Sequence, residues 1–133
     1  MRPIITAICA AALMASPVAA QESDPVAEAS AVVQNHVDAY RSGNIDRFVA
    51  TFAEDATVVA NGISMTGHKD IKAFYALNFG KDAPEIQIVE SGVVDGRIYM
   101  AVAYIFADGT ELCCSYSEYT VEGGKITYLE SNS

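Results

Sequence analysis

The sequence predicts an α+β domain in which helices pack on one face of an antiparallel sheet. Two observations lead to this prediction. Between residues 25 and 79, apolar residues recur at the spacing of amphipathic helices. From residue 85 onward, β-branched and aromatic residues alternate between Gly-containing turn pairs, which is typical of hairpins. Helices first and an antiparallel meander afterwards indicate segregated layers.

The first twenty residues have the features of a secretory signal peptide. A basic start at Arg2 precedes an apolar run from Ile4 to Met14, and Val18 and Ala20 stand at the −3 and −1 positions of a cleavage site. The apolar run is too short for a membrane-spanning helix. We therefore expect cleavage after Ala20 and export to the periplasm or beyond.

Cleavage would leave residues 21–133, which is enough for one domain with a single core. It removes one Arg and no acidic residue, so the net charge changes from −9 to −10. This charge argues against binding to nucleic acid or to an anionic membrane, because both need a basic surface. Two adjacent cysteines, Cys113 and Cys114, cannot form a disulfide framework. No metal-ligand spacing, phosphate loop or nucleotide motif occurs in the sequence, so no metal or cofactor is expected.

Three helices are predicted. The first begins at Asp24-Pro25, where an N-cap acceptor precedes a Pro at the first helical position, and it ends at Ser42-Gly43. The second is short and is capped by Asn44, and the third follows Gly67 and ends near Phe79-Gly80. Their buried stripes consist of Val26, Ala29, Ser30, Val33, Val37 and Tyr40, of Ile45, Phe48, Val49 and Phe52, and of Ile71, Phe74, Tyr75 and Asn78.

The strands are predicted from β-branched runs and from the turn pairs between them. A hairpin is expected over residues 56–60 and 63–66, around Asn61-Gly62. Because turn pairs separate the further runs, the rest of the chain should form a meander. Its strands are predicted over residues 85–94, 97–107, 110–122 and 125–132, separated by Asp95-Gly96, Asp108-Gly109 and Gly123-Gly124.

One face of the strand at residues 97–107 is larger and more apolar, and we assign it to the core. A two-residue turn at Asp108-Gly109 would place Met100 opposite Ser117. The inner face of the next strand is then polar at its centre, and its hydroxyls either bond backbone and water or line a pocket. The two inner faces consist of Ile98, Met100, Val102, Tyr104 and Phe106, and of Cys113, Ser115, Ser117, Tyr119 and Val121.

The outer face of the same strands carries small and aromatic residues on which a second copy of the chain could pack. Alternation along the strand sends Cys113 and Cys114 to opposite faces. We therefore expect two separate thiols rather than a vicinal disulfide, which would break the strand. The hypothetical homodimer would use Tyr99, Ala101, Ala103, Cys114 and Tyr116.

Several short motifs follow one another along the chain in a characteristic order. They are Val32-Val33-Gln34, Gly43-Asn44-Ile45-Asp46, Phe52-Ala53-Glu54-Asp55-Ala56, Gly67 with Ile71 and Phe74-Tyr75, and Gly124-Lys125-Ile126. This order resembles the nuclear transport factor 2-like superfamily, in its SnoaL-like and ketosteroid-isomerase-like branch. The resemblance implies a cone-shaped barrel, with a curved sheet wrapped around a long helix and a cavity at the wide end. It implies no single activity, because the superfamily includes enzymes, binding proteins and assembly domains.

The resemblance to steroid isomerases can be followed at four catalytic positions. His36 takes the place of a Tyr that donates to the oxyanion, and Ser117 takes the place of a carboxylic acid that shares this role. Ala60 stands where the proton-transferring Asp would lie, and Tyr75 matches a supporting Tyr. Because Ala cannot move a proton, the sequence argues against steroid isomerisation by that mechanism. The Arg and two Asp of limonene-epoxide hydrolase relatives are not evident either.

His36 lies at the edge of the first helix's apolar stripe, and two interpretations stay open. The imidazole could act as an acid or base near neutral pH, or it could be a satisfied core histidine bonded to Tyr40 or to a backbone carbonyl. A nucleophile at Ser117 would also need an orienting acid, which Glu130 supplies if the turn at Gly123-Gly124 has two residues. A longer turn would shift the register and face other residues inward, namely Thr127, Leu129 and Ser131.

Three functional hypotheses follow. The leading one is an internal cavity that binds a small apolar or aromatic molecule without a cofactor. The second is an isomerase, dehydratase or hydrolase acting on a small cyclic substrate, with His36 and Ser117 as catalytic residues. The third is a homodimeric interaction module. The candidate pocket consists of His36, Tyr40, Phe52, Tyr75, Met100, Tyr104, Ser115, Ser117 and Tyr119.

Overall fold

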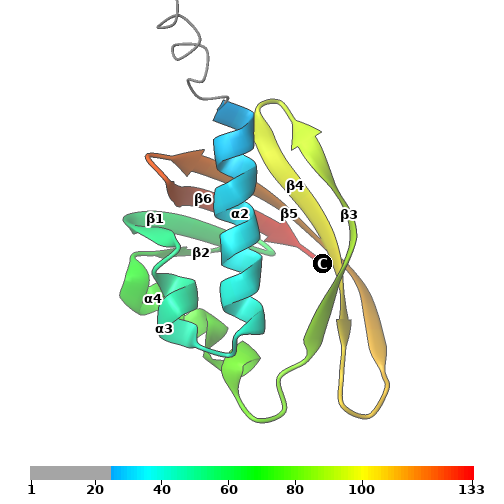
Figure 1. Cartoon of the computed structure of the whole chain (residues 1–133). Coiled ribbons are helices and arrows are strands. Elements are labelled where there is room, and N and C mark those ends of the chain that lie inside the picture. Colours follow the sequence, from blue (N-terminus) through cyan, green and yellow to red (C-terminus); the bar gives the residue numbers. More distant parts are fainter. Residues whose placement is uncertain (1–24) are drawn as a thin grey trace, which may run out of the picture.

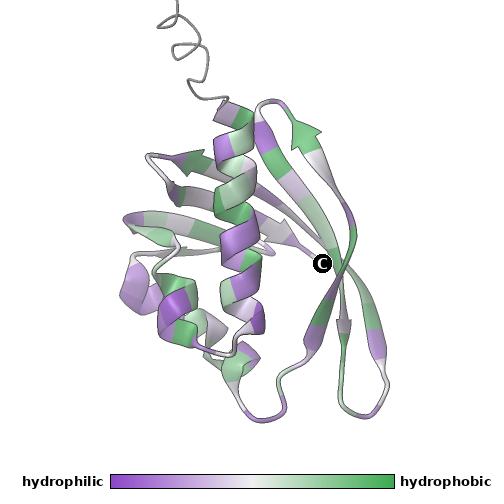
Figure 2. Cartoon of the chain, viewed as in Figure 1, coloured by the Kyte–Doolittle hydropathy of each residue, from purple (hydrophilic) through white to green (hydrophobic). Residues whose placement is uncertain are grey.

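A long helix, α2 (Pro25–Arg41), crosses the concave face of a curved sheet in the computed structural model, which describes residues 25–133 (Figure 1). The predicted signal peptide and the predicted cap at Asp24 lie outside the described residues. The side of α2 that faces the sheet buries Val33, His36 and Val37. Hydrophobic and hydrophilic colours alternate along its ribbon, as expected for a helix that buries one face (Figure 2). Among these residues, no helix is long and apolar enough to cross a membrane.

The sheet has six strands in the order β2-β1-β6-β5-β4-β3 and is not closed into a barrel. Neighbouring strands are antiparallel except β1 and β6, which run parallel. The predicted α+β class is therefore confirmed, but the sheet is mixed rather than wholly antiparallel. Its strands are β1 (Phe52–Ala60), β2 (Ile63–Thr66), β3 (Glu85–Val94), β4 (Arg97–Ile105), β5 (Glu111–Glu122) and β6 (Lys125–Asn132).

Two short helices, α3 (Ile45–Val49) and α4 (His68–Tyr75), lie beside β1 and β2, and α4 continues into the 3-10 turn η2 (Ala76–Phe79). The predicted cap of α3 is present, because the Asn44 side chain accepts a hydrogen bond from the Arg47 N–H at 3.1 Å. The third predicted helix was expected to end near Phe79-Gly80. Its α-helical part is shorter, because α4 ends at Tyr75 and the 3-10 turn η2 follows. Phe74, predicted on its buried stripe, is 40% exposed.

Phe52 was predicted to lie on the second helix, and this prediction is wrong. The helix ends at Val49 and Phe52 begins β1. The reason is Thr51, whose side-chain hydroxyl donates to the carbonyl of Phe48 at 2.6 Å. This bond satisfies a carbonyl at the helix end and turns the chain into the strand.

Three of the four predicted turn pairs form two-residue hairpin turns. Asn61-Gly62 and Asp95-Gly96 have positive φ at both residues, as type I′ turns require. Gly123-Gly124 also connects directly paired residues, Glu122 and Lys125. The exception is Asp108-Gly109, where Phe106 and Thr110 pair through a 2.9 Å bond and enclose a three-residue loop.

A β-bulge compensates for the longer loop between β4 and β5. Met100 pairs with Ser117, as predicted, although the predicted turn was one residue too short. The register shifts next to Ala103, which pairs with Cys113 and leaves Cys114 as the extra residue of β5. At the centre of the sheet, β4 and β5 therefore keep the predicted pairing. A longer loop together with a bulge produces it, rather than a two-residue turn.

The prediction of two separate thiols is wrong. The structure joins Cys113 and Cys114 by a disulfide, and the peptide bond between them is cis. Strict alternation would have separated the two side chains, but the bulge interrupts it at this point. Cys113 is also exposed rather than part of the inner face.

A second bulge changes the register between β5 and β6. Val121 pairs with Ile126, whereas Thr120 pairs with Tyr128, so that Thr127 is the extra residue. Glu130 consequently lies opposite Glu118 and is exposed. The alternative register, with Leu129 and Ser131 facing inward, is the one found, although a bulge and not a longer turn produces it.

The core lies between α2 and the concave face of the sheet. Both shorter helices contribute to it, and β1 and β6 supply its centre. Its largest fully buried side chains are Phe48, Phe52, Ile71, Ile126, Leu129 and Val58.

The register of β6 can be checked by substitution. Leu129 is 2% exposed, so Leu129→Ala should lower the free energy of unfolding by about 2–5 kcal/mol in urea titrations. Glu130→Ala, one residue further, should change it by less than about 0.5 kcal/mol. A large loss for Glu130→Ala together with a small one for Leu129→Ala would contradict this register.

Candidate functional site

An inner cavity of about 60 Å³ lies between α2 and the sheet. Seven of the nine residues predicted for the pocket line it: His36, Tyr40, Tyr75, Met100, Tyr104, Ser117 and Tyr119. The remaining lining residues, which the sequence did not single out as pocket residues, are Val37, Phe48, Ile86, Val102, Leu129 and Ser131.

The other two predicted pocket residues stand behind the lining. The ring of Phe52 packs edge-on against that of His36, with centroids 5.2 Å apart. Ser115 is buried, and its hydroxyl lies 3.2 Å from that of Ser131. Both therefore support lining residues without reaching the cavity themselves.

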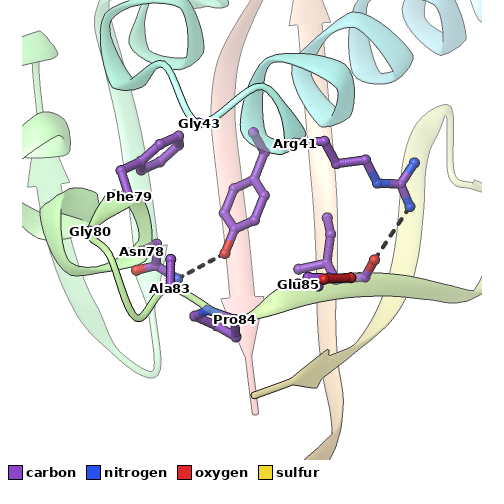
Figure 3. Close-up of a pocket in the computed structure, with 10 residues that line it drawn as sticks. Arg41, Gly43, Asn78, Phe79, Gly80, Ala83, Pro84 and Glu85 are labelled. Atoms are coloured by element: carbon purple, nitrogen blue, oxygen red, sulfur yellow. Dashed lines mark hydrogen bonds between the residues drawn. The ribbon is translucent and has the colours of Figure 1, made fainter. Parts of the chain in front are cut away.

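A wider mouth cavity of about 400 Å³ opens beside the inner one, at the end of α2 (Figure 3). The two cavities share Tyr40 and Ile86, which form the boundary between them. The Tyr40 hydroxyl accepts a hydrogen bond from the side-chain amide of Asn78 at 3.2 Å, which holds the ring at this boundary (Figure 3). Much of the mouth comes from the chain between η2 and β3, where no sequence pattern pointed to a site.

The side chain of His36 is buried, with 4% exposure. Its Nδ1 lies 2.8 Å from the Thr51 hydroxyl, so its partner is neither of those expected, Tyr40 or a backbone carbonyl. Burial lowers the pKa of His36 to about 3. The imidazole is therefore neutral at neutral pH.

Aromatic rings enclose the His36 imidazole. The ring centroids of Phe48 and Tyr119 lie 4.6 Å and 5.4 Å from that of His36. Together with Phe52, these rings shield the imidazole from water, which is the physical origin of its low pKa. Sequence reasoning found all three aromatic residues but not their arrangement around one histidine.

Hydroxyl groups gather on the sheet side of the inner cavity. The Ser117 hydroxyl donates to that of Ser131 at 3.1 Å. Burial raises the pKa of Tyr75, and burial also raises the pKa of Tyr119. Within residues 25–133, no Asp, Glu, Lys or Arg lines this cavity, so its polar groups are uncharged at neutral pH.

The catalytic constellation considered from the sequence is not assembled. In the described part of the chain, no hydrogen bond joins His36 to Ser117, and the exposed Glu130 faces away from both. Ala60 is buried at the end of β1 and brings no acid to the cavity. A base whose pKa is about 3 removes protons poorly at neutral pH, so the arrangement suits binding better than acid–base catalysis.

The described residues form no metal centre, because no three His, Cys, Asp or Glu side chains lie close enough together to hold an ion. His68, the other histidine of this part, places its Nε2 2.9 Å from the carbonyl of Phe52. It therefore connects the start of α4 to β1.

The low pKa of His36 predicts a stability loss in acid. The unfolded chain takes up a proton near pH 6.5 that the folded chain accepts only near pH 3, so stability falls as the pH decreases between these values. Between pH 7.5 and 4.5 this group should lower the free energy of unfolding by about 3 kcal/mol. The His36→Gln variant should lack this part of the pH dependence in urea titrations. Equal pH dependence in both proteins would show that His36 is not held neutral.

Comparisons with known proteins bear on this site. The SnoaL-like domain family matches residues 33–129. No curated protein matches the chain. Among solved structures, an NTF2-like protein from Mesorhizobium loti superposes with a TM-score of 0.70 at 14% identity, over 84% of this chain and 95% of that one.

Two further solved structures have the same fold. A protein from Mycobacterium tuberculosis in complex with estradiol-17beta-hemisuccinate has a TM-score of 0.65 at 15% identity, over 78% of this chain and 92% of that one. A protein from Xanthomonas campestris named a polyketide cyclase has a TM-score of 0.66 at 19% identity, over 83% and 93%. Identities this low show the fold alone, whereas the family match covers most of the chain. The chain therefore belongs to the SnoaL-like domain family, and its fold is that of the NTF2-like structures.

Proposed function

We propose that this protein is exported and binds a small, largely apolar molecule. The part of this molecule that enters the inner cavity carries no charge. The observation that carries the proposal is the inner cavity, whose polar groups are all uncharged and sit among apolar side chains. Ligand sites typically combine an apolar lining with a few placed hydrogen-bonding groups. A charged group buried in such a cavity would lose its hydration without gaining an ionic partner.

The sizes of the two cavities indicate how a ligand is accommodated. An apolar cavity of about 150 Å³ holds benzene, so the inner cavity, at about 60 Å³, admits only the end of a molecule. The mouth, at about 400 Å³, has room for a ring system, and its two charged lining residues, Arg41 and Glu85, carry opposite charges. The ligand body therefore lies in the mouth, and its leading group passes Tyr40 and Ile86.

The similar structures support a small-molecule role. The Mycobacterium tuberculosis protein is bound to estradiol-17beta-hemisuccinate, and the Xanthomonas campestris protein is named a polyketide cyclase. Both names refer to polycyclic or ring-forming compounds. A ligand with a fused or aromatic ring suits the aromatic side chains around the boundary between the two cavities.

The experiment that tests this proposal is mass spectrometry of the protein purified from the exported fraction. Under native conditions the mass should equal that of residues 21–133 plus a small organic molecule. A mature mass with no added molecule, in protein that also fails to bind ring compounds, would contradict the ligand-binding function.

The boundary between the cavities gives a sharper prediction. Ile86→Trp fills the passage and should weaken binding of 2-naphthol at least about tenfold in calorimetric titrations, because the ligand's leading group can no longer enter. Ile88→Trp is the matched control, since Ile88 lies two residues along the same strand and lines neither cavity. Equal weakening in both variants would indicate a general packing effect rather than a blocked passage.

A homodimer through the outer sheet face is a second, compatible proposal. Tyr99 and Tyr116 stack there with ring centroids 5.6 Å apart and an interplanar angle of 19°, and Tyr116 is 38% exposed. These stacked rings form a flat aromatic surface of the kind that is enriched in interfaces.

The Tyr116→Glu variant should be monomeric in light scattering where the wild-type protein is dimeric, because the interface would have to bury the new carboxylate. Phe74→Glu is the control, since Phe74 is similarly exposed but lies on α4. A monomeric wild-type protein at every accessible concentration would exclude the dimer.

A further inference from the structure

The hydrogen bonds around Thr51 determine which nitrogen of His36 carries the proton. The Thr51 hydroxyl has two close neighbours, the Phe48 carbonyl at 2.6 Å and His36 Nδ1 at 2.8 Å. A hydroxyl has one proton, and a carbonyl oxygen can only accept. The Thr51 proton therefore goes to Phe48, and the bond to His36 requires a proton on Nδ1.

This arrangement leaves the second nitrogen of His36 as an acceptor. In a neutral imidazole with its proton on Nδ1, Nε2 carries a lone pair. The ring lines the inner cavity, and no residue between 25 and 133 donates a hydrogen bond to Nε2. A buried acceptor without a donor is costly, so Nε2 is available to accept a hydrogen bond from a molecule in the cavity that His36 lines.

We infer that the ligand carries a hydroxyl group that donates a hydrogen bond to Nε2 of His36. The inference rests on the proposed function and narrows its ligand class to alcohols or phenols with an apolar body. Ethers and ketones of the same shape have no proton to donate and would leave Nε2 unpaired. Tyr75 lines the same cavity, and its hydroxyl, which has no hydrogen bond to the described residues, is available to donate to the ligand's oxygen in return.

Two probes of nearly equal shape test whether the ligand donates the hydrogen bond to Nε2 of His36. The first, 2-naphthol, can donate a hydrogen bond, whereas 2-methoxynaphthalene cannot. Titration of the purified protein at pH 7 should give an affinity about tenfold higher for 2-naphthol, because only this probe satisfies Nε2. Equal affinities, or a preference for the ether, would overturn the inference while leaving the proposed function in place.

Substitution of Thr51 should change the preference without touching the cavity lining. In Thr51→Val, which has a nearly identical shape, Nδ1 has no acceptor, and the proton is free to move to Nε2. The tenfold higher affinity for 2-naphthol over 2-methoxynaphthalene should then disappear. Thr51→Ser keeps the hydroxyl and should keep the preference. An unchanged preference in Thr51→Val would contradict the role assigned to Thr51.

A second variant keeps the test decisive if Thr51→Val does not fold. In His36→Asn the side-chain amide can still donate to Thr51, but its acceptor oxygen is one bond closer to the backbone than Nε2 and does not reach the position of that nitrogen. This variant should bind both probes with equal affinity. A retained preference for 2-naphthol would show that another group receives the ligand's proton.

The protonated nitrogen can also be observed directly in the free protein. Long-range proton–nitrogen NMR correlations distinguish the two tautomers of a neutral histidine. A proton on Nδ1 of His36 supports the inference, and a proton on Nε2 overturns it whatever the probes do. If neither probe binds, the proposed function fails for naphthalene compounds. The tautomer seen by NMR then decides by itself whether Nε2 of His36 can accept a hydrogen bond.

Discussion

One buried contact, between His36 on α2 and Thr51 just before β1, holds together the parts from which the cavity is built. The Thr51 hydroxyl reaches α2 through His36 and α3 through the Phe48 carbonyl, and the Thr51 carbonyl accepts from the Ile126 N–H at 3.0 Å. Two helices and two parallel strands thus meet at one residue. Because a buried imidazole must be satisfied by hydrogen bonds, this contact fixes both the end of α3 and the orientation of the ring in the cavity.

Much of the architecture could be predicted because it depends on local patterns. Turn chemistry located the hairpins, and alternation along β4 placed Met100 on the inner face, whereas its predicted pairing with Ser117 holds only because a bulge compensates for a longer loop. Two bulges were not predictable, since the extra residues Cys114 and Thr127 carry no turn signal and their positions depend on packing across the sheet. The same limit applies to Thr51, whose role exists only because distant segments converge on it.

The distribution of charge separates the properties of the surface from those of the site. The chain has a net charge of −9, yet no charged side chain lines the inner cavity in the part of the chain that the structure describes. The acidic residues therefore act on solubility and on the approach of other molecules. Selection inside the cavity depends on shape and on the direction of individual hydrogen bonds, which a strongly acidic exterior does not determine.

The bulge at Thr127 also suggests how this scaffold could acquire new chemistry. If Thr127 paired with Thr120 instead of bulging out, every later residue of β6 would move by one position, and Glu130 would lie opposite Ser117 with its carboxylate on the cavity side. A neutral binding site would gain an acid through a shift of register alone. In evolutionary terms, the step between a binding protein and a potential enzyme on this fold can be a change of strand register rather than a change of residue.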